Sequence, residues 1–507
     1  MHLQKKKNKS GSISIQIRQR EAAGSKLVKT IGCSFDPGVI EQLIVKGKQE
    51  IARLIGQRPI NFDALKEQEL VDVFFNRIEA VSLVGPELLL GKLFDEIGFN
   101  ALTEDLFRHL VITRLVYPVS KLKTTDYLFK YKGITIDVDA IYRYLDKLQK
   151  EQIEQIQKIS FAHTLQILED KLSVVFYDVT TLYFEAADED DLRKTGFSKD
   201  GKHQQPQIVL GLLVSAGGYP LDYNIFEGSK YEGDTMLPVL GYFEKKYTHS
   251  KLIVVADAGL LSNKNIAQLI EKRYEFILGA RIKNETEAIK EQIFKLKFAD
   301  GDSYLIEKEN KHRLIISYSV NRSKNDAHNR KRGITKLEKA LNSGKLNKKH
   351  INNKGYNKYL KLEGQLSISI DYEKYQGDAK WDGLKGYLTN TSLPKEEVIN
   401  QYKQLWNIEK TFRISKSDLR IRPIYHHLKR RIESHICISF AACKIYKELE
   451  RQLRIRKCSL SAEKVIDILK TIYQLTITTP YSNTKHSRLL VKNEEQQLII
   501  NLFDLKI

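Results

Sequence analysis

Residues 173–184 read SVVFYDVTTLYF, a run of β-branched and aromatic residues that contains a single charge, at Asp178. Such a run is typical of a strand that is buried on both faces of a sheet. Comparable apolar runs follow at Gln207–Ser215, Lys251–Asp257 and Tyr274–Ala280. The middle of the chain therefore predicts a sheet with a buried core.

The segments between these strands predict how the sheet is connected. Gly217 and Gly218 turn the second strand into a third at Tyr219–Phe226, as in a hairpin. Helical periodicity marks Asp234–Tyr247 and Asn263–Arg273. The order strand, hairpin, helix, strand, helix, strand predicts an α/β domain with a mixed sheet and flanking helices. This order fits the ribonuclease-H-like architecture.

Two acids interrupt these apolar strands. Asp178 lies inside the first strand, and Asp257 ends the fourth and is followed by Ala-Gly. A buried carboxylate is costly unless it is paired or binds a cation, and either acid alone also fits a hydrogen-bonded acid at a strand end. In a ribonuclease-H-like sheet the two strands are neighbours, so the carboxylates converge. Converging carboxylates favour a divalent cation such as Mg²⁺ between them.

A third acid is expected on a helix beside this sheet. The segment 396–420 reads EEVINQYKQLWNIEKTFRISKSDLR and predicts one long helix over Glu396–Leu419. At 100° per residue, one stripe carries charged and aromatic groups, at Tyr402, Glu409, Arg413, Lys416 and Arg420. The adjoining apolar stripe faces the core, with Val398, Leu405, Ile408, Phe412 and Leu419. Glu409 is the candidate third acid, although a solvated face with salt bridges gives the same pattern.

The charge of the chain indicates a polyanionic partner. The sequence has 83 Lys and Arg residues against 63 Asp and Glu, a net charge of +20 over 507 residues. Three stretches are the most basic: the first thirty residues, residues 321–361 and residues 403–431. Any one run also fits a solvated loop, but three separate runs favour a shared surface that binds nucleic acid. A membrane surface is the weaker alternative.

The pattern along the chain predicts six segments. Residues 1–60 combine short strands with a helix, and residues 61–170 are helical, either a DNA-binding domain or a structural cap. Residues 171–283 and 393–455 form the two parts of the α/β core, separated by a β-rich, basic insertion at 284–392. Residues 456–507 predict a C-terminal helical segment.

Cysteine usage and hydropathy narrow the class of protein. Cys33, Cys437, Cys443 and Cys458 have neither zinc-type spacing nor the number that a disulfide framework needs, which indicates reduced thiols in a cytosol. The basic N-terminal segment is followed by no apolar run of the signal-peptide kind. No run of about 18 apolar residues predicts a membrane-spanning helix.

The helix around Glu409 resembles the signature of a known family. The DDE transposases of bacterial insertion sequences in the IS-four superfamily carry the pattern Tyr-x2-Arg-x3-Glu-x6-Lys. Tyr402, Glu409 and Lys416 match it in type and spacing, and Leu405 stands at the Arg position. The resemblance extends over roughly residues 60–450 and includes FYDVTTLYF around Asp178, GFSKDGKHQQPQIVLGLLVSAGGYPLDYNIFEG at 196–228, ADAGL at 256–260 and RPIYHHLKRRIESH at 422–435. Ser229 follows Glu-Gly where the family commonly has Asn.

The resemblance implies a role for each matching residue. Asp178, Asp257 and Glu409 would hold two Mg²⁺ or Mn²⁺ ions for in-line displacement at a phosphodiester. Tyr402 and Lys416 would contact phosphates near the cut bond. The remaining basic residues would continue the DNA track, namely Arg413, Arg420, Arg422, Lys429, Arg430 and Arg431. Trp381 fits either a buried core position or the base-stacking residue of the family's insertion.

The resemblance also implies a transposase that cuts double-stranded DNA at transposon inverted repeats and transfers the ends to target DNA. Its partners would be those DNA ends and a second copy of the chain in a synaptic homodimer. A nucleoid-associated location in a bacterial cytoplasm follows, and no membrane partner is expected. Two alternatives stay open: an inactive or domesticated relative that only binds DNA, and a metal-dependent nuclease on the same fold.

Overall fold

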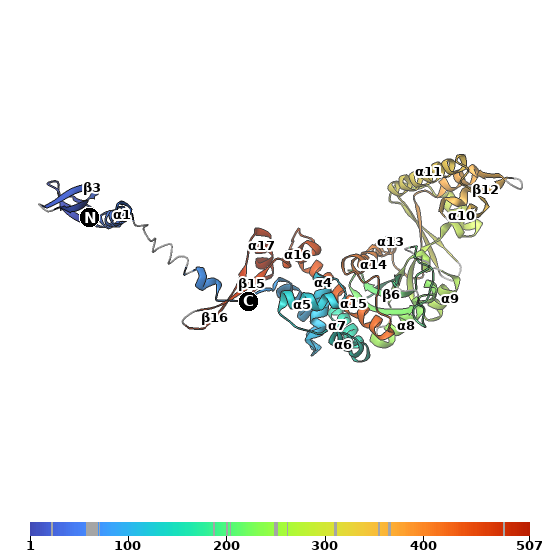
Figure 1. Cartoon of the computed structure of the whole chain (residues 1–507). Helices are drawn as coiled ribbons and strands as arrows, with labels where there is room; N and C mark the ends of the chain where they lie inside the picture. The colour runs from blue at the N-terminus through green and yellow to red at the C-terminus, as the bar shows by residue number, and fades with distance from the viewer. Residues whose placement is uncertain are drawn as a thin grey trace. The chain divides into compact units, whose positions relative to one another are not determined.

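The computed structural model describes residues 1–21, 24–56, 69, 71–185, 188–198, 201–202, 204–247, 252–260, 262–308, 312–352, 355–363, 367–479 and 482–506. The chain divides into two compact units (Figure 1). The first comprises Met1–Val81 with Leu475–Arg488, and the second comprises Ser82–Gln474 with Leu489–Ile507. The predicted boundary between residues 1–60 and 61–170 lies outside the described residues. None of the described helices has the length and apolar character that crossing a bilayer requires.

The core of the second unit is an eight-stranded mixed sheet with the order β10-β11-β14-β9-β8-β5-β6-β7. β5 pairs antiparallel with β6, β6 antiparallel with β7, and β5, β8 and β9 run parallel. The order β7-β6-β5-β8-β9 confirms the predicted ribonuclease-H-like arrangement. The strand bounds are β5 Val174–Tyr183, β6 Gln207–Ser215, β7 Pro220–Glu227, β8 Ile253–Ala256, β9 Glu275–Ala280, β10 Ser303–Glu307, β11 Arg313–Tyr318 and β14 Leu384–Thr389.

Both faces of this sheet are buried, because alternate side chains of each strand enter different cores. Phe176 and Val255 belong to the core that also contains α14 (Trp406–Arg413) and α15 (Lys429–Ile455). Tyr177 and Val254 face the opposite core, which α8 (Met236–Tyr247) and α9 (Asn263–Glu271) cover. The apolar, β-branched composition of the strands follows from this double burial.

The predicted helices upstream of the sheet are present. They are α3 Lys92–Ile97, α4 Asp105–Val116, α5 Lys121–Lys132, α6 Val138–Glu151 and α7 Ile153–Ile167, with a π-helical turn η1 at Glu87–Gly91. α15 packs against α4, α6 and α7, and their apolar residues join one continuous core with the sheet (Figure 1). These helices are therefore built into the second unit and share the core of its sheet.

The insertion contains more helix than its sequence predicts. β10, β11 and β14 extend the central sheet, and β12 (Leu360–Glu363) pairs with β13 (Ser367–Ile370). Between β11 and β12 runs α11 (Val320–Asn342), a helix of 23 residues that carries much of the basic run. Short helical segments complete it, with α10 at Glu287–Lys295, α12 at Tyr372–Gly377 and η9 at Asp378–Trp381. The β-rich expectation missed α11 because few apolar residues mark its buried face.

The predicted long helix around Glu409 is broken into three pieces. They are α13 (Lys395–Lys403), α14 and a π-helical turn η10 at Ile414–Asp418. Between α13 and α14, hydrogen bonds join residues three apart, from Leu405 N to Tyr402 O and from Ile408 N to Leu405 O. Such a turn advances about 120° per residue instead of 100°. A single helical wheel therefore does not describe both Tyr402 and Glu409.

The first unit begins with a three-stranded antiparallel sheet, β1 (His2–Lys7), β2 (Ile13–Glu21) and β3 (Gly24–Ser34). α1 (Pro37–Leu54) follows, and Asp36 caps it by accepting from Gly38 N and Val39 N. The strands and helix predicted for residues 1–60 are confirmed within the described residues.

The C-terminal segment departs from the all-helical prediction. α16 (Ala462–Leu469) and α17 (Glu494–Phe503) are helices, but β15 (Tyr473–Thr478) and β16 (Lys485–Leu490) lie between them as strands. β15 forms the centre of a three-stranded sheet with β16 and β4 (Ile78–Leu83). Its sequence YQLTIT is β-branched, and pairing with a strand almost 400 residues away is a contact that local periodicity does not report.

Candidate active site

Two carboxylates lie side by side on adjacent parallel strands. Asp178 is half-buried inside β5, and Asp257 is exposed directly after β8. The register pairs Tyr177 with Ala256, so the next residue along each strand is an aspartate. Neighbouring strands are about 4.8 Å apart. The sheet therefore brings together the two acids that the sequence predicts to converge.

Because side chains alternate along a strand, both acids point to the same side of the sheet as the residues beneath α14. Asp178 is two residues beyond Phe176, and Asp257 two residues beyond Val255, and both apolar residues belong to the core beneath α14. The Asp178 carboxylate accepts a hydrogen bond from Val179 N at 2.8 Å. This backbone donor restrains the carboxylate at the face that α14 covers.

Glu409 lies on α14, the helix whose apolar side packs on this face. Its buried side carries Ile408 and Phe412, while Glu409 is exposed. Two hydrogen bonds attach the helix to the turn between β6 and β7, from Asn407 Nδ2 to Ala216 O at 2.9 Å and from Thr411 Oγ1 to Gly218 O at 3.0 Å. The rotation of α14, and with it the direction of Glu409, is fixed by these contacts.

The side chain of Lys385, on β14, interacts electrostatically with both Asp257 and Glu409. Burial and the positive charge of Arg322 lower the pKa of Lys385, whereas the negative charges of Asp257 and Glu409 act in the opposite direction. Its Nζ lies 4.4 Å from the centre of the Tyr402 ring. Sequence analysis missed this residue, although a lone lysine in the apolar strand LKGYLT is the same kind of signal as Asp178 in β5.

Tyr402 is a partner of Asp257 and lies in the core. It is only 4% exposed, and its Oη donates a hydrogen bond to Asp257 Oδ1 at 2.9 Å. Burial and the charge of Asp257 raise the pKa of Tyr402, so the phenol stays protonated and keeps donating. The family resemblance implied a phosphate contact for Tyr402, whereas in the structure the ring is buried and the hydroxyl donates to Asp257. The 3₁₀-type turn after Tyr402 is the reason for the difference.

The described residues contain no three His, Cys, Asp or Glu side chains close enough together to hold a metal ion by themselves. Asp178 and Asp257 are thus juxtaposed, and Glu409 faces the same region without completing a ligand cluster. Mg²⁺ commonly uses one or two carboxylates and takes its other ligands from water and substrate phosphate. The oxygen donors of the two aspartates fit such a cation.

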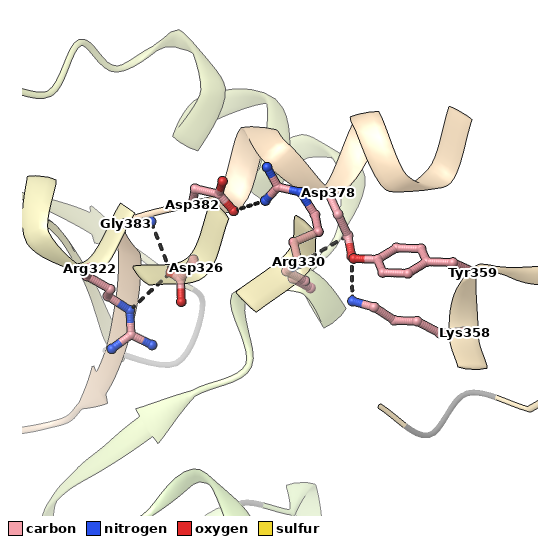
Figure 2. Close-up of polar contacts among 9 residues, drawn as sticks. Arg322, Asp326, Arg330, Lys358, Tyr359, Asp378, Asp382 and Gly383 are labelled. Atoms are coloured by element: carbon pink, nitrogen blue, oxygen red, sulfur yellow. Dashed lines mark hydrogen bonds and ion pairs between the residues drawn. The ribbon is translucent and has the colours of Figure 1, made fainter. Parts of the chain in front are cut away.

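A cavity of about 830 Å³ opens beside Asp257 and Tyr402. Its opposite wall comes from the insertion and is held by ion pairs (Figure 2). Arg330 on α11 pairs with Asp382, and Asp378 accepts from Lys358 and, at 2.8 Å, from the Tyr359 hydroxyl. Arg322 Nε lies 3.7 Å from Asp326 on the same wall. Basic side chains therefore face this cavity alongside the acids that hold them in place.

Trp381 also lines this cavity. It is half-buried and packs against Phe294, with ring centres 4.6 Å apart, while Lys283 Nζ lies 5.9 Å from its ring. One part of the residue therefore packs in the core of the insertion, and another part borders the cavity.

The predicted DNA-contacting residues differ in exposure and in their partners. Arg413 and Arg420 are exposed, as are Lys429 and Arg430, and Lys416 is half-buried in η10. Arg430 and Arg431 both bind Asp146 on α6, at 2.8 and 2.9 Å, which gives them a role in holding α15 against α6. The guanidinium of Arg422 lies 5.7 Å from the Tyr183 ring at the end of β5. Leu405 is buried, as the predicted apolar stripe requires.

The chain matches a known family model and has low-identity similarity to solved structures. A family model described as "Transposase DDE domain" matches residues 169–443. The structure is similar to a piggyBac transposase synaptic complex with hairpin DNA, at 10% identity and a TM-score of 0.38, covering 76% of this chain and 79% of that one. It is also similar to a Mos1 transposase paired-end complex with the left transposon end, at 11% identity and a TM-score of 0.16, covering 34% and 57%. No curated protein matches the chain.

Proposed function

Because the chain belongs to the transposase DDE domain family, we propose that it cuts double-stranded DNA at the ends of a mobile element and joins those ends to target DNA. The observation that carries the proposal is the pair Asp178 and Asp257 on adjacent parallel strands, inside the matched region and beneath α14. The Tyr402, Glu409 and Lys416 spacing favours the IS-four group of bacterial insertion sequences as its origin.

In this proposal, Asp178, Asp257 and Glu409 hold the divalent cations, two Mg²⁺ or Mn²⁺ ions. Bound ions of this kind would supply Lewis acidity at the phosphodiester. Tyr402 keeps the Asp257 carboxylate in one orientation through its hydrogen bond. Lys385 lies close enough to Asp257 and Glu409 for both negative charges to act on its pKa. Its ammonium group would bind the phosphate. Lys416, Arg413, Arg420, Arg422 and Lys429 continue the DNA contacts, and Trp381 offers a face to an unstacked base.

The chemistry consists of two displacements at phosphorus. In the first, water attacks a phosphodiester at the element's end and the bond to the 3′ oxygen breaks, which leaves a free 3′ hydroxyl. In the second, that hydroxyl loses its proton and attacks a phosphodiester of the target. Its oxygen becomes the new bridging oxygen, the bond from phosphorus to the target strand's 3′ oxygen breaks, and that oxygen leaves as a free 3′ hydroxyl. Positioning of nucleophile and phosphate accounts for much of the rate enhancement in such steps. A homodimer that holds two ends, in the nucleoid of a bacterial cytoplasm, completes the proposal.

The test uses a plasmid that carries the gene with its native flanking DNA, incubated with the full chain and Mg²⁺. Asp178→Asn, Asp257→Asn and Glu409→Gln should each lower excision on the order of 100-fold or more, because each removes a charge that stabilises the displacement. Asp170→Asn and Glu397→Gln are matched controls, since both acids are exposed and lie outside the site. Their excision rates should equal wild type.

The outcomes separate the alternatives. Excision and joining by the wild type, lost in the three variants, supports the transposase. DNA binding without strand breaks in Mg²⁺ or Mn²⁺ identifies an inactive relative. Strand breaks without joined products identify a nuclease. Cleavage that survives in all three variants contradicts the assignment of the acids.

A further inference from the structure

A second cavity of the catalytic unit is lined by cations. Its volume is about 530 Å³, and it lies between α4, α5 and the segment that follows η10. Five basic residues border it, namely Arg114, Lys121, Lys123, Arg420 and Arg422. No Asp or Glu among the described residues lines it. The cavity beside Asp257 differs, because acids line it together with its cations.

Two of these cations are buried without a negative partner. Arg114 and Lys121 are each 6% exposed. Arg114 Nη1 donates to Leu419 O at 3.5 Å and Nη2 to His435 Nδ1 at 3.4 Å, both neutral acceptors. His435 can accept there because its Nε2 donates to Ile421 O at 3.0 Å. Within the described part of the chain, the Lys121 ammonium has neither a hydrogen bond nor an ion pair.

A buried charge without a partner is costly unless a ligand of opposite charge completes the site. Burial, followed by the neighbouring positive charges of Lys121 and Arg114, lowers the pKa of His426 in the same cavity to about 3. The histidine is thereby neutral. Burial and the neighbouring charge of Arg114 also lower the pKa of Lys121 well below its usual range, so an anion that enters the cavity favours the charged form of this lysine. An anion that enters gains attraction from several directions at once.

The N-terminus of α5 adds to this potential. Lys121 is the first residue of this 12-residue helix, and the Ser120 side chain accepts from Lys123 N at 3.3 Å. The helix directs its positive end toward the lining, where backbone dipoles favour anions. Arg420 on the facing segment has φ +45°, a left-handed conformation that is uncommon for arginine. Strained residues of this kind concentrate at ligand sites.

The position of the cavity relative to Asp178 suggests the source of the anion. Arg422 lies against the ring of Tyr183, at the end of the strand that carries Asp178 five residues earlier. Five residues of strand span about 17 Å. One strand of B-DNA carries a phosphate for about each 3.4 Å along the helix axis. Five nucleotides are also about half a turn of B-DNA, so the strand cut at Asp178 then faces away, and the phosphate that a duplex lying along β5 turns toward this cavity belongs to its other strand.

We infer that the cavity around Lys121 and Arg114 binds a backbone phosphate of the DNA duplex whose scissile bond lies at Asp178. A volume in the range of ligand pockets is large enough for a phosphodiester with its flanking sugars. The site would set the register of the duplex on the enzyme, because phosphate contacts fix position without reading sequence. This inference rests on the proposed function, since it takes DNA as the substrate.

The test compares Lys121→Met with Lys130→Met in duplex binding. Lys130 is exposed near the other end of α5, so Lys130→Met removes the same charge outside the cavity. Binding of the full chain to a duplex from the native flanking DNA is measured in EDTA at several salt concentrations. Lys121→Met should reduce the slope of log K against log salt by about 0.9 and weaken binding roughly eightfold at 0.1 M salt. Lys130→Met should change the slope by a smaller amount.

Thermal unfolding without DNA distinguishes a ligand site from a structural lysine. Replacing an unpartnered buried charge with an apolar side chain should raise the Tm of Lys121→Met by about 2–4 °C. A Tm that falls together with binding indicates a structural lysine and overturns the inference. Inorganic phosphate, compared with chloride at equal ionic strength, should raise the Tm of the wild type more than that of Lys121→Met.

The results separate this inference from the proposed function. Equal salt slopes for the two variants, with wild-type binding intact, overturn the phosphate site and leave the transposase standing. Equal slopes combined with protection by inorganic phosphate assign the cavity to free phosphate, which also overturns the DNA assignment. A wild type that binds no duplex overturns both. A reduced slope with a raised Tm in Lys121→Met supports the site.

Discussion

The hydrogen bond from Tyr402 to Asp257 couples the hydrophobic core to the proposed catalytic edge. The phenol ring is packed between Lys385, at 4.4 Å, and Tyr387, whose ring centre is 5.0 Å away. The donor therefore cannot rotate away from the carboxylate it serves. An aspartate that follows a strand and is exposed has few other restraints, so the orientation of Asp257 depends on this one buried residue.

Tyr402→Phe removes this hydrogen bond and keeps the ring. DNA cleavage should fall by about 10- to 100-fold, the usual cost of losing a group that orients a metal-binding carboxylate. The free energy of unfolding should change by only about 1 kcal/mol. Single-turnover cleavage and urea unfolding measure the two effects.

Tyr387→Phe is the matched control for Tyr402→Phe. The Tyr387 hydroxyl contacts Ser317 Oγ at 3.3 Å and does not touch Asp257. Its cleavage rate should remain close to wild type. Equal losses in both variants would show that Tyr402 acts through packing alone.

The juxtaposition of Asp178 and Asp257 follows from the sequence, whereas the burial of Tyr402 does not, for a physical reason. Asp178 and Asp257 follow from strand neighbours, which the order of elements determines. Leu405 and Phe412 fall on the apolar stripe and are buried. Tyr402 lies on the other side of a turn in which hydrogen bonds join residues three apart. A periodicity of 3.6 residues contains no information about such a turn.

At the scale of elements, strand β9 lies unusually close to helix α13. A Cβ atom on Gly279 would lie 2.4 Å from Tyr402 Oη and 3.0 Å from Ala258 N. Only a residue without a side chain permits this approach. The glycine therefore sets the distance at which α13 can hold Tyr402 against the residue that follows β8.

Gly279→Ala should separate these two elements. Overpacking of this kind costs about 1–3 kcal/mol of stability. Cleavage should fall at least as far as in Tyr402→Phe, because the hydroxyl is displaced from Asp257. Calorimetry and the plasmid excision assay give the two quantities.

Gly241→Ala on α8 is the control for Gly279→Ala, because a Cβ there meets no atom within 4 Å. It should stabilise the protein by about 0.5–1 kcal/mol and leave cleavage unchanged. If Gly279→Ala retains wild-type cleavage, the contact between β9 and α13 does not position the site.

The sequence predicted the central strands better than it predicted helix α11. β5, β6 and β8 are buried on both faces, so almost every residue in them contributes to the signal. α11 buries only Gly333, Ile334 and Leu337 on its inner side. Its remaining surface is rich in Asn, Lys and Arg, a composition that resembles a loop. The structure shows that this helix forms because a small separate core, with Tyr359 and Leu360, packs against it.

For the whole molecule, three neutral histidines make stability dependent on pH. Burial, then the charge of Lys444, lowers the pKa of His163 to about 4. Burial and nearby cations lower that of His426 to about 3 and that of His435 well below its usual range. Unfolding exposes all three histidines, so below about pH 6.5 the unfolded chain binds protons that the folded chain does not bind.

Stability should therefore fall as the pH decreases from about 6.5 to 4. Each histidine contributes up to about 1.4 kcal/mol per pH unit in this window, because the unfolded state binds more protons there. Urea unfolding at pH 6.5, 5.5 and 4.5 measures the slope. His163→Gln should reduce it, whereas His328→Gln on the exposed surface of α11 should not. Identical slopes for wild type and His163→Gln would contradict this account.

The structure shows where two of the basic runs behind the net charge of +20 lie in the folded molecule. Residues of the run 321–361 form one wall of the cavity beside Asp257, where Asp378 and Asp382 hold them. Residues of the run 403–431 reach the cavity around Lys121. The sequence predicted that these runs bind a polyanion. It did not reveal Arg114 and Lys121, because two basic residues in a helical region carry no compositional signal.

The insertion starts and ends inside the central sheet. β14 returns antiparallel to β9, with Gly386 opposite Ala280, and β11 pairs with β14 in turn. The insertion therefore cannot be replaced as one independent module without disrupting the central sheet. The part between β11 and β14 is free to change in length and composition, whereas β10, β11 and β14 must be inherited with the sheet they complete. Divergence within this lineage should accumulate in that interval and spare the strands on either side.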